Sequence, residues 1–140
     1  MKIFCSGIGG IGLSAYAALQ QAEGHRVSGS DRGEASPVIA DLQKGGISVS
    51  TDQSGDALPP DTDLFIYSEA IPEDSPERKK ALRSGMTQMS YPQALGRYLH
   101  GKKTIAVCGT HGKSSVTAMA GKLLTETGMD PTIVVGTRMR

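Results

Sequence analysis

Apolar residues over the first thirty positions alternate between two spacings, one typical of a strand and one of a helix. Residues 3–5 form a short apolar run, and apolar side chains then recur at helical spacing between residues 11 and 22. Gly24 ends the helical pattern, and residues 26–30 resemble a second strand. The pattern predicts a strand, a helix and a parallel strand joined by a right-handed connection.

The same alternation continues to about residue 100. Ser36-Pro37 and Ser75-Pro76 are both typical of the N-terminal cap and first turn of a helix, and glycines end each helical pattern. The remaining predicted elements are a helix from Ser36 to Gly45, a strand around residues 47–49, a buried strand over residues 64–67, a helix from Ser75 to Gly85, a short segment near residues 86–89 and a helix over about residues 92–99.

A second alternation begins near residue 102. It predicts a buried strand over residues 104–108, a turn, a helix over residues 114–127 with Ala118, Leu123 and Leu124 facing inward, and a strand at residues 133–135. These elements are too few to close a nucleotide-binding domain. We therefore expect residues 1–100 to form a Rossmann-like parallel-sheet α/β domain, and residues 101–140 to be the incomplete start of a P-loop ATPase domain.

Composition excludes several classes of partner. The 140 residues carry 15 basic and 14 acidic side chains, so the net charge of +1 gives no footprint for nucleic acid or an anionic membrane. No signal-peptide pattern or apolar run of about 18 residues occurs, so we expect a cytoplasmic protein. Cys5 and Cys108 both lie in apolar runs, which predicts reduced, packed thiols.

The first cluster of glycines fits a dinucleotide-binding fingerprint. Gly7, Gly9 and Gly12 match G-x-G-x-x-G between a strand and a helix, and Asp31 follows about 20 residues later. Gly7 would permit a tight turn, Gly9 would bring backbone N–H groups to a pyrophosphate, Gly12 would let the helix pack on the strand, and Asp31 would bind a ribose hydroxyl. The motif alone leaves NAD, FAD, a UDP-sugar and a glycine turn without ligand all open.

The second cluster of glycines fits a phosphate-binding loop between a strand and a helix. Lys113 would reach the β- and γ-phosphates, and the Ser114 hydroxyl would bind Mg²⁺. Val107 stands where the longer standard pattern has Gly, so the loop is of a shorter kind. We expect a backbone role for His111, not a role as general base. The nucleotide-binding residues predicted here are Gly109, Thr110, His111, Gly112, Lys113, Ser114 and Ser115.

Taken together, these stretches resemble the Mur ligase family in order and spacing over nearly the whole chain. The residues that carry the resemblance are Gly7-Ile8-Gly9-Gly10-Ile11-Gly12, Ser28-Gly29-Ser30-Asp31, Ser68-Glu69-Ala70-Ile71, Ser75-Pro76-Glu77 and the loop over residues 109–115. The chain departs from the family pattern in the pair Ser114-Ser115, which replaces the usual Thr pair, in Glu69, where Ser is common, and in lacking a His near Asp52-Gln53.

The resemblance implies an enzyme of peptidoglycan synthesis that joins L-alanine to UDP-N-acetylmuramate. Mg-ATP would phosphorylate the muramoyl carboxylate, the amine would attack the acyl phosphate, and Lys113 with Mg²⁺ would neutralise the transferring phosphoryl group. The first glycine loop would then hold the UDP of the sugar instead of a redox cofactor. The resemblance assigns to the nucleotide sugar Gly7, Ile8, Gly9, Gly10, Ile11, Gly12, Asp31, Ser68 and Ala70.

Three other interpretations remain open at this stage. A nicotinamide-dependent oxidoreductase would explain the first loop but not the second. A murein tripeptide ligase would use the same nucleotide sugar, and the two ligases differ in a domain that this chain does not contain. A non-catalytic binding module is the third. In each ligase interpretation, we expect these 140 residues to bind the UDP-sugar without ligating anything by themselves.

Overall fold

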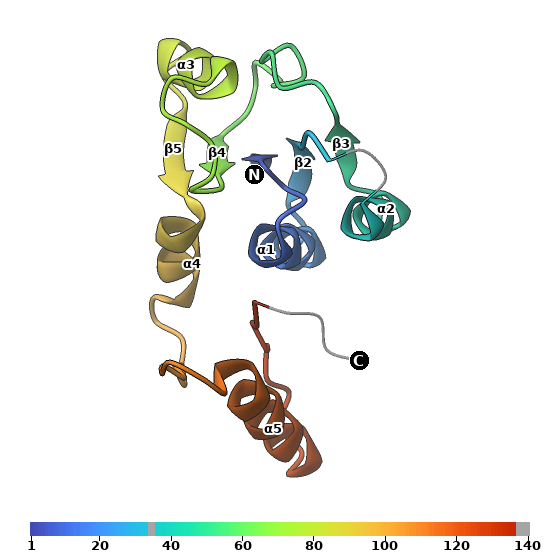
Figure 1. Ribbon diagram of the computed structural model, residues 1–140, viewed down its shortest axis with the longest axis vertical. Coiled ribbons are helices and arrows are strands. Elements are labelled where there is room, and N and C mark those ends of the chain that lie inside the picture. Colours follow the sequence, from blue (N-terminus) through green and yellow to red (C-terminus); the bar gives the residue numbers. More distant parts are fainter. Residues whose placement is uncertain (34–35, 137–140) are drawn as a thin grey trace. The chain divides into compact units, whose positions relative to one another are not determined.

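The computed structural model describes residues 1–33 and 36–136, and the chain divides into two compact units, residues 1–98 and residues 99–140. Each unit is described by itself. The elements in chain order are β1 (Lys2–Ser6), α1 (Ile11–Ala22), β2 (Arg26–Ser30), α2 (Pro37–Lys44), β3 (Ser48–Ser50), β4 (Leu64–Tyr67), α3 (Pro76–Arg83), β5 (Thr87–Ser90), α4 (Tyr91–Leu99) and α5 (Lys113–Glu126) (Figure 1).

The first unit is built on a five-stranded parallel sheet with the order β3-β2-β1-β4-β5. The chain adds β2 and β3 on one side of β1, and then returns to place β4 against the other side. The strand order therefore reverses between β1 and β4. In open α/β sheets of this kind, ligands bind outside the carboxyl ends of the strands at such a switch point.

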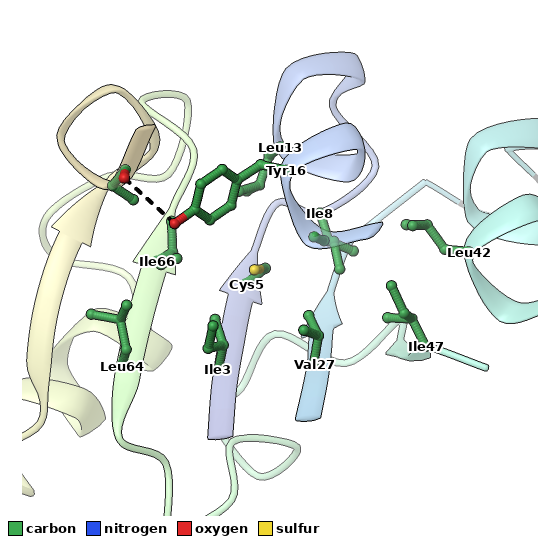
Figure 2. Close-up of a cluster of buried hydrophobic side chains, with 12 residues drawn as sticks. Ile3, Cys5, Ile8, Leu13, Tyr16, Val27, Leu42, Ile47, Leu64 and Ile66 are labelled. Atoms are coloured by element: carbon green, nitrogen blue, oxygen red, sulfur yellow. Dashed lines mark hydrogen bonds between the residues drawn. The ribbon is translucent and has the colours of Figure 1, made fainter. Parts of the chain in front are cut away.

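Alternate residues of the central strands build two separate cores, one on each face of the sheet. Ile3 and Cys5 of β1 face a core that α1, α2 and α4 cover (Figure 2), whereas Phe4 packs on the opposite face with Phe65 of β4 and Ala81 of α3. The Tyr16 hydroxyl donates a hydrogen bond of 3.4 Å to the Ala94 carbonyl, which ties α1 to α4 (Figure 2). Burial on both faces explains why the central strands are continuous apolar runs.

Helix termini lie where the sequence signals place them. The Ser36 and Ser75 hydroxyls accept hydrogen bonds from the Val38 and Arg78 N–H groups, and a proline begins each helix. The predictions for β2 and β4 are confirmed at both ends, α4 forms where a helix was expected, and the short segment near residues 86–89 is the strand β5. Local signals therefore determine most element boundaries in this unit.

The second unit corrects two of the expectations from sequence. The helix is confirmed as α5, but residues 104–108 and 133–135 form no strand. Leu123 is 63% exposed and not inward-facing, and Gly121 is instead the buried position, in contact with Ile133. A strand forms only where another strand completes its hydrogen bonds, and no strand of the described residues pairs with either segment.

The two cysteines differ in their surroundings. Cys5 is fully buried in β1, and its burial raises the pKa of the thiol to about 12. Cys108 is exposed, so the prediction of a packed thiol is wrong for this residue, because the strand that would have buried it does not form. Both thiols are free. Within the described residues, no helix is both long enough and apolar enough to span a membrane.

Candidate functional site

A cavity of about 510 Å³ lies beyond the carboxyl ends of β1, β2 and β4. Its walls come from the loops that follow β1, β2, β3 and β4 and from the first turn of α3. The residues that line it are Gly7, Gly10, Asp31, Arg32, Gln53, Ser68, Ala70, Ile71, Pro72, Asp74, Ser75, Pro76 and Glu77. Five of the residues predicted to bind a nucleotide sugar therefore share one cavity: Gly7, Gly10, Asp31, Ser68 and Ala70.

The glycine loop borders the cavity at Gly7, where its backbone lies close to the Ser68 side chain. Gly7 has a φ of 77°, its N–H donates to the Ser30 carbonyl at 2.8 Å, and a Cβ placed on it would lie 3.0 Å from the Ser68 Cβ. Only glycine satisfies both the left-handed backbone and the narrow gap. Ile8, the next residue, points into the core and is fully buried (Figure 2), so it anchors the loop and does not line the cavity.

The first turn of α1 leaves backbone donors at the loop. Gly10 occupies the N-cap position without a side-chain cap, and the first turn contains no acidic residue. The first N–H groups of a helix have no acceptor within it, and the helix dipole makes this end positive. Ile11, at the start of α1, is 42% exposed. This end of α1 is suited to bind an anionic group such as a phosphate.

Asp31 is bound to the backbone on both of its oxygens. Oδ2 accepts from the Gly9 N–H and Oδ1 from the Gly33 N–H, each at 2.8 Å. The N–H of Gly9, which the sequence-based interpretation directed toward a pyrophosphate, is donated to this carboxylate in the structure. A Cβ on Gly9 would lie 2.8 Å from the Asp31 Cγ, so glycine is needed here to admit Asp31.

Two further glycines make room for packing contacts that cannot be seen in the sequence. A Cβ on Gly12 would lie 2.9 Å from the ring of Tyr91 at the start of α4, so Gly12 admits an aromatic ring. The atoms nearest to such a Cβ belong to α4, whereas the motif indicated packing of the helix on the strand. A Cβ on Gly29 would lie 2.3 Å from the Cys5 carbonyl, which makes Gly29 necessary for the β1–β2 pairing.

The loop between β4 and α3 forms the opposite wall and is fastened at several points. The Ile71 N–H donates to the Ser68 carbonyl at 2.8 Å, and the Ile71 carbonyl accepts from Arg78 Nη1 at 3.2 Å. The Arg78 guanidinium lies 3.9 Å from the centre of the Tyr67 ring, a cation–π arrangement. Arg78 therefore joins the end of β4, the loop and α3.

Glu77 is the residue of this wall that reasoning from sequence missed. It is 1% exposed, its Oε2 accepts a hydrogen bond from the Ser6 hydroxyl at the end of β1, and its Oε1 has no hydrogen-bond partner among the described residues. In the sequence it was part of a helix start and of the family resemblance, and no ligand contact was assigned to it. Its burial depends on the packing of α3 beside β1 and β4, which no local pattern specifies.

Two of the three departures from the family pattern, Glu69 and the absence of a His near Asp52-Gln53, differ in their position relative to the cavity. Gln53 lines the cavity, and its Nε2 lies 3.5 Å from the Ser30 Oγ. Glu69 is exposed and is not among the lining residues. The exposed carboxyl of Asp52, next to Gln53, accepts hydrogen bonds from the N–H and the hydroxyl of Ser54. Both bonds lower the pKa of Asp52, and the bond from the N–H has the larger effect.

The second glycine loop belongs to the other unit. Gly112 is the N-cap of α5 with a left-handed φ of 76°, and the Lys113 ammonium donates to the Gly109 carbonyl at 2.6 Å and the Thr110 carbonyl at 3.4 Å. Lys113 thus folds over its own loop. His111 and Ser115 are exposed, and Ser114 is partly buried. No strand precedes the loop, so the expected strand–loop–helix context is present only in its loop and helix.

A parallel sheet of this order, with a glycine loop beyond β1 at the switch point, defines an α/β domain with a Rossmann-like sheet. The chain belongs to the Mur ligase family: the family model described as Mur ligase family, catalytic domain matches residues 2–103.

Individual relatives are also similar along nearly the whole chain. The UDP-N-acetylmuramate–L-alanine ligase of Carboxydothermus hydrogenoformans is 41% identical over 92% of this chain and 28% of its own length. The crystal structure of the UDP-N-acetylmuramate–alanine ligase MurC of Thermotoga maritima has a TM-score of 0.92 at 35% identity, covering 99% of this chain and 32% of that one.

A related ligase with a different acceptor is also similar. The UDP-N-acetylmuramate:L-alanyl-γ-D-glutamyl-meso-diaminopimelate ligase from Neisseria meningitides has a TM-score of 0.87 at 28% identity, covering 96% of this chain and 43% of that one. The chain spans less than a third of the length of the L-alanine ligases reported above.

Proposed function

We propose that this chain binds UDP-N-acetylmuramate in the cavity beyond β1 and β4, as the nucleotide-sugar-binding part of a ligase that joins L-alanine to that sugar. One observation carries the proposal: Gly7 and Gly10 of the glycine loop line a cavity at the switch point of the sheet. The similarity to L-alanine ligases, 41% identical over 92% of the chain in one relative, supports this choice of nucleotide sugar over a nicotinamide cofactor.

The cavity offers separate places for the parts of such a ligand. The uncapped N-terminus of α1 favours the pyrophosphate, and the exposed guanidinium of Arg32 adds a positive charge beside it. Ser68 and Ala70 form the facing wall, where the sugar or nucleoside would contact them. Ile8 and Gly12 act indirectly, because they position the loop through the core and Tyr91.

The second glycine loop would serve the ATP-dependent step of the same ligase. The backbone of residues 109–115 would surround the phosphates, and Lys113 would exchange its bonds to the Gly109 and Thr110 carbonyls for phosphate oxygens. Within the described residues, no group of three His, Cys, Asp or Glu side chains is placed to hold a metal. Ser114 is the residue there that would bind Mg²⁺, which neutralises phosphate charge when bound.

We accordingly propose residues 1–100 as the UDP-sugar-binding domain and residues 101–140 as the beginning of the ATP-binding domain, in a cytoplasmic enzyme of peptidoglycan synthesis. These residues correspond to 28% of the length of the L-alanine ligase from Carboxydothermus hydrogenoformans. We therefore expect the 140-residue chain to bind the nucleotide sugar and not to form an amide by itself.

Titration calorimetry of the 140-residue chain tests the proposal. UDP-N-acetylmuramate and UDP should give saturable heats, and NADH should give none at the same concentrations. NADH binding in the absence of any response to UDP-N-acetylmuramate would instead favour an oxidoreductase domain.

A second candidate is a ligase that transfers the murein tripeptide to the same sugar, favoured by the TM-score of 0.87 to such an enzyme. Both candidates predict the same behaviour of this chain toward the UDP-sugar. Supplying the full-length enzyme with ATP, UDP-N-acetylmuramate and either L-alanine or the tripeptide separates them, because only the true acceptor will support phosphate release.

A further inference from the structure

We propose that Glu77 is a ligand-contact residue: its buried carboxylate accepts a hydrogen bond from a neutral N–H or O–H group of the bound nucleotide sugar. The inference deepens the proposed function and rests on it. It adds a specificity-determining acceptor to the cavity, at a residue that the glycine motifs do not include.

The first argument is the state of the carboxylate. Glu77 is 1% exposed, and only one of its oxygens is satisfied, by the Ser6 hydroxyl. Oε1 is buried without a hydrogen-bond partner in the described part of the chain. Buried polar atoms in folded proteins are paired almost without exception, and an unpaired one is costly. Because Glu77 also forms part of the cavity wall, a ligand in that cavity is positioned to complete the pairing.

The second argument is the distribution of donors and acceptors around the cavity. Donors lie on the side of β2 and α1, where Arg32, Gln53 and the first turn of α1 are found. The Asp31 carboxylate on that side is already bound to two backbone N–H groups. Glu77 therefore provides an unused acceptor on the opposite side, at α3. A ligand with an anionic group and a neutral donor group fits this polarity, with its phosphates toward α1 and its donor toward Glu77.

The third argument is the rigidity of the position. Ser75 caps α3 and Pro76 occupies its first turn, so the backbone that carries Glu77 is held at the start of the helix. The Ser6 hydroxyl, at the carboxyl end of β1, fixes the side chain itself. An acceptor that is already oriented loses little conformational freedom when a ligand binds, which increases its contribution to affinity.

The test uses the 140-residue chain, titration calorimetry and thermal unfolding without ligand. Glu77→Met keeps a similar volume and removes both acceptor oxygens. We expect the Kd for UDP-N-acetylmuramate to rise about tenfold or more, as for loss of a hydrogen bond to a charged group. The unfolding midpoint without ligand should stay within about 5 °C of the parent value, because the unpaired oxygen is also removed.

Two further variants keep the test decisive. Glu126→Met makes the same substitution at an exposed position of α5 and should leave the Kd unchanged. Glu77→Gln preserves the shape of the side chain even if the methionine variant folds poorly. The amide of the Glu77→Gln variant either presents its NH₂ group to the donor of the ligand or accepts the hydrogen bond through an uncharged oxygen. The Kd of this variant for UDP-N-acetylmuramate should therefore still rise about threefold to tenfold.

The position of the donor follows from shorter ligands. If the Glu77 variants lose the same affinity for UDP as for UDP-N-acetylmuramate, the donor belongs to the uridine. If they lose affinity only for UDP-N-acetylmuramate, the donor belongs to the sugar. The proposal is overturned if the parent binds and both Glu77 variants bind within twofold of it. It is also overturned if Glu77→Met loses stability while its ligand affinity and that of Glu77→Gln are unchanged, since Glu77 would then be purely structural. If the parent does not bind, the proposed function fails and this inference fails with it.

Discussion

Asp31 and Gly9 are joined by a hydrogen bond of 2.8 Å from the Gly9 backbone N–H to Oδ2 of the Asp31 carboxylate. The contact connects the end of β2 to the glycine loop, and it depends on the absence of a side chain at Gly9. The glycine loop and Asp31, which the fingerprint separates by about 20 residues, are therefore in direct contact in this protein.

Replacing Gly9 by Val should therefore weaken binding of UDP-N-acetylmuramate by about tenfold or more, because the new side chain displaces Asp31 and the loop. Overpacking of this kind should also lower the free energy of unfolding by about 1–3 kcal/mol. Calorimetry and urea unfolding measure the two effects. Gly96→Ala is the control, since a Cβ at Gly96 in α4 meets nothing within 4 Å and should leave binding unchanged. Unaltered binding by Gly9→Val would show that the contact with Asp31 is dispensable.

Replacing Arg78 by Lys should loosen the wall formed by the loop between β4 and α3. A lysine cannot at once stack on Tyr67 and donate to the Ile71 carbonyl as the planar guanidinium does. We expect a loss of about 1 kcal/mol in stability and a severalfold rise in the Kd for UDP. Arg83→Lys, at an exposed position of the same helix, should change neither quantity. Equal behaviour of the two variants would argue against the role of Arg78 in holding the loop.

Lys113→Ala should leave binding of the UDP-sugar by this chain unchanged, because Lys113 begins α5 in the second unit and makes its hydrogen bonds to the loop before that helix. In the full-length ligase, the same change should remove about 3 kcal/mol of transition-state stabilisation, or roughly a hundredfold in rate. Steady-state phosphate release measures that effect. Near-normal ligation by the variant would assign the second glycine loop a structural role.

Hydrogen exchange should be faster in residues 102–136 than in residues 1–98. Gly121 is the only fully buried residue among the described residues 99–136, whereas the five-stranded sheet has a core on each face. Amides open more readily where few apolar contacts cover them. Mass-spectrometric exchange of the 140-residue chain checks this, and uniform protection of both segments would contradict it.

The two thiols should differ sharply in reactivity. At pH 8 a disulfide reagent should label Cys108 in the native protein and both cysteines only after unfolding, because Cys5 is buried with a pKa raised to about 12. Because burial raises the pKa of Cys5 from 9.0 to about 12, its contribution to the stability of the fold is fully present below pH 9.0. That contribution is lost as the pH rises from 9.0 toward 12, so alkaline unfolding should begin in this interval. Rapid native labelling of Cys5 would contradict its burial.

Local sequence signals specify most of the elements of the first unit and its glycine loop. The bounds of β2 and β4 and the Ser-Pro caps of α2 and α3 were all predictable, because apolar periodicity and capping act over a few residues. The glycine loop between β1 and α1 was predictable for the same reason, whereas its position in a cavity at the switch point depends on the strand order, which no local pattern specifies.

The partners of these elements depend on packing between distant parts of the chain. The contact of Gly12 with Tyr91, the bonding of Asp31 to Gly9, and the burial of Glu77 beside Ser6 each join residues that lie far apart in the chain. Residues 104–108 are an apolar run typical of a strand, but they form no strand because no strand in the described part of the chain pairs with them. A strand and a buried carboxylate are both completed by groups from elsewhere in the fold, so a local pattern can predict the need for a partner but cannot identify it.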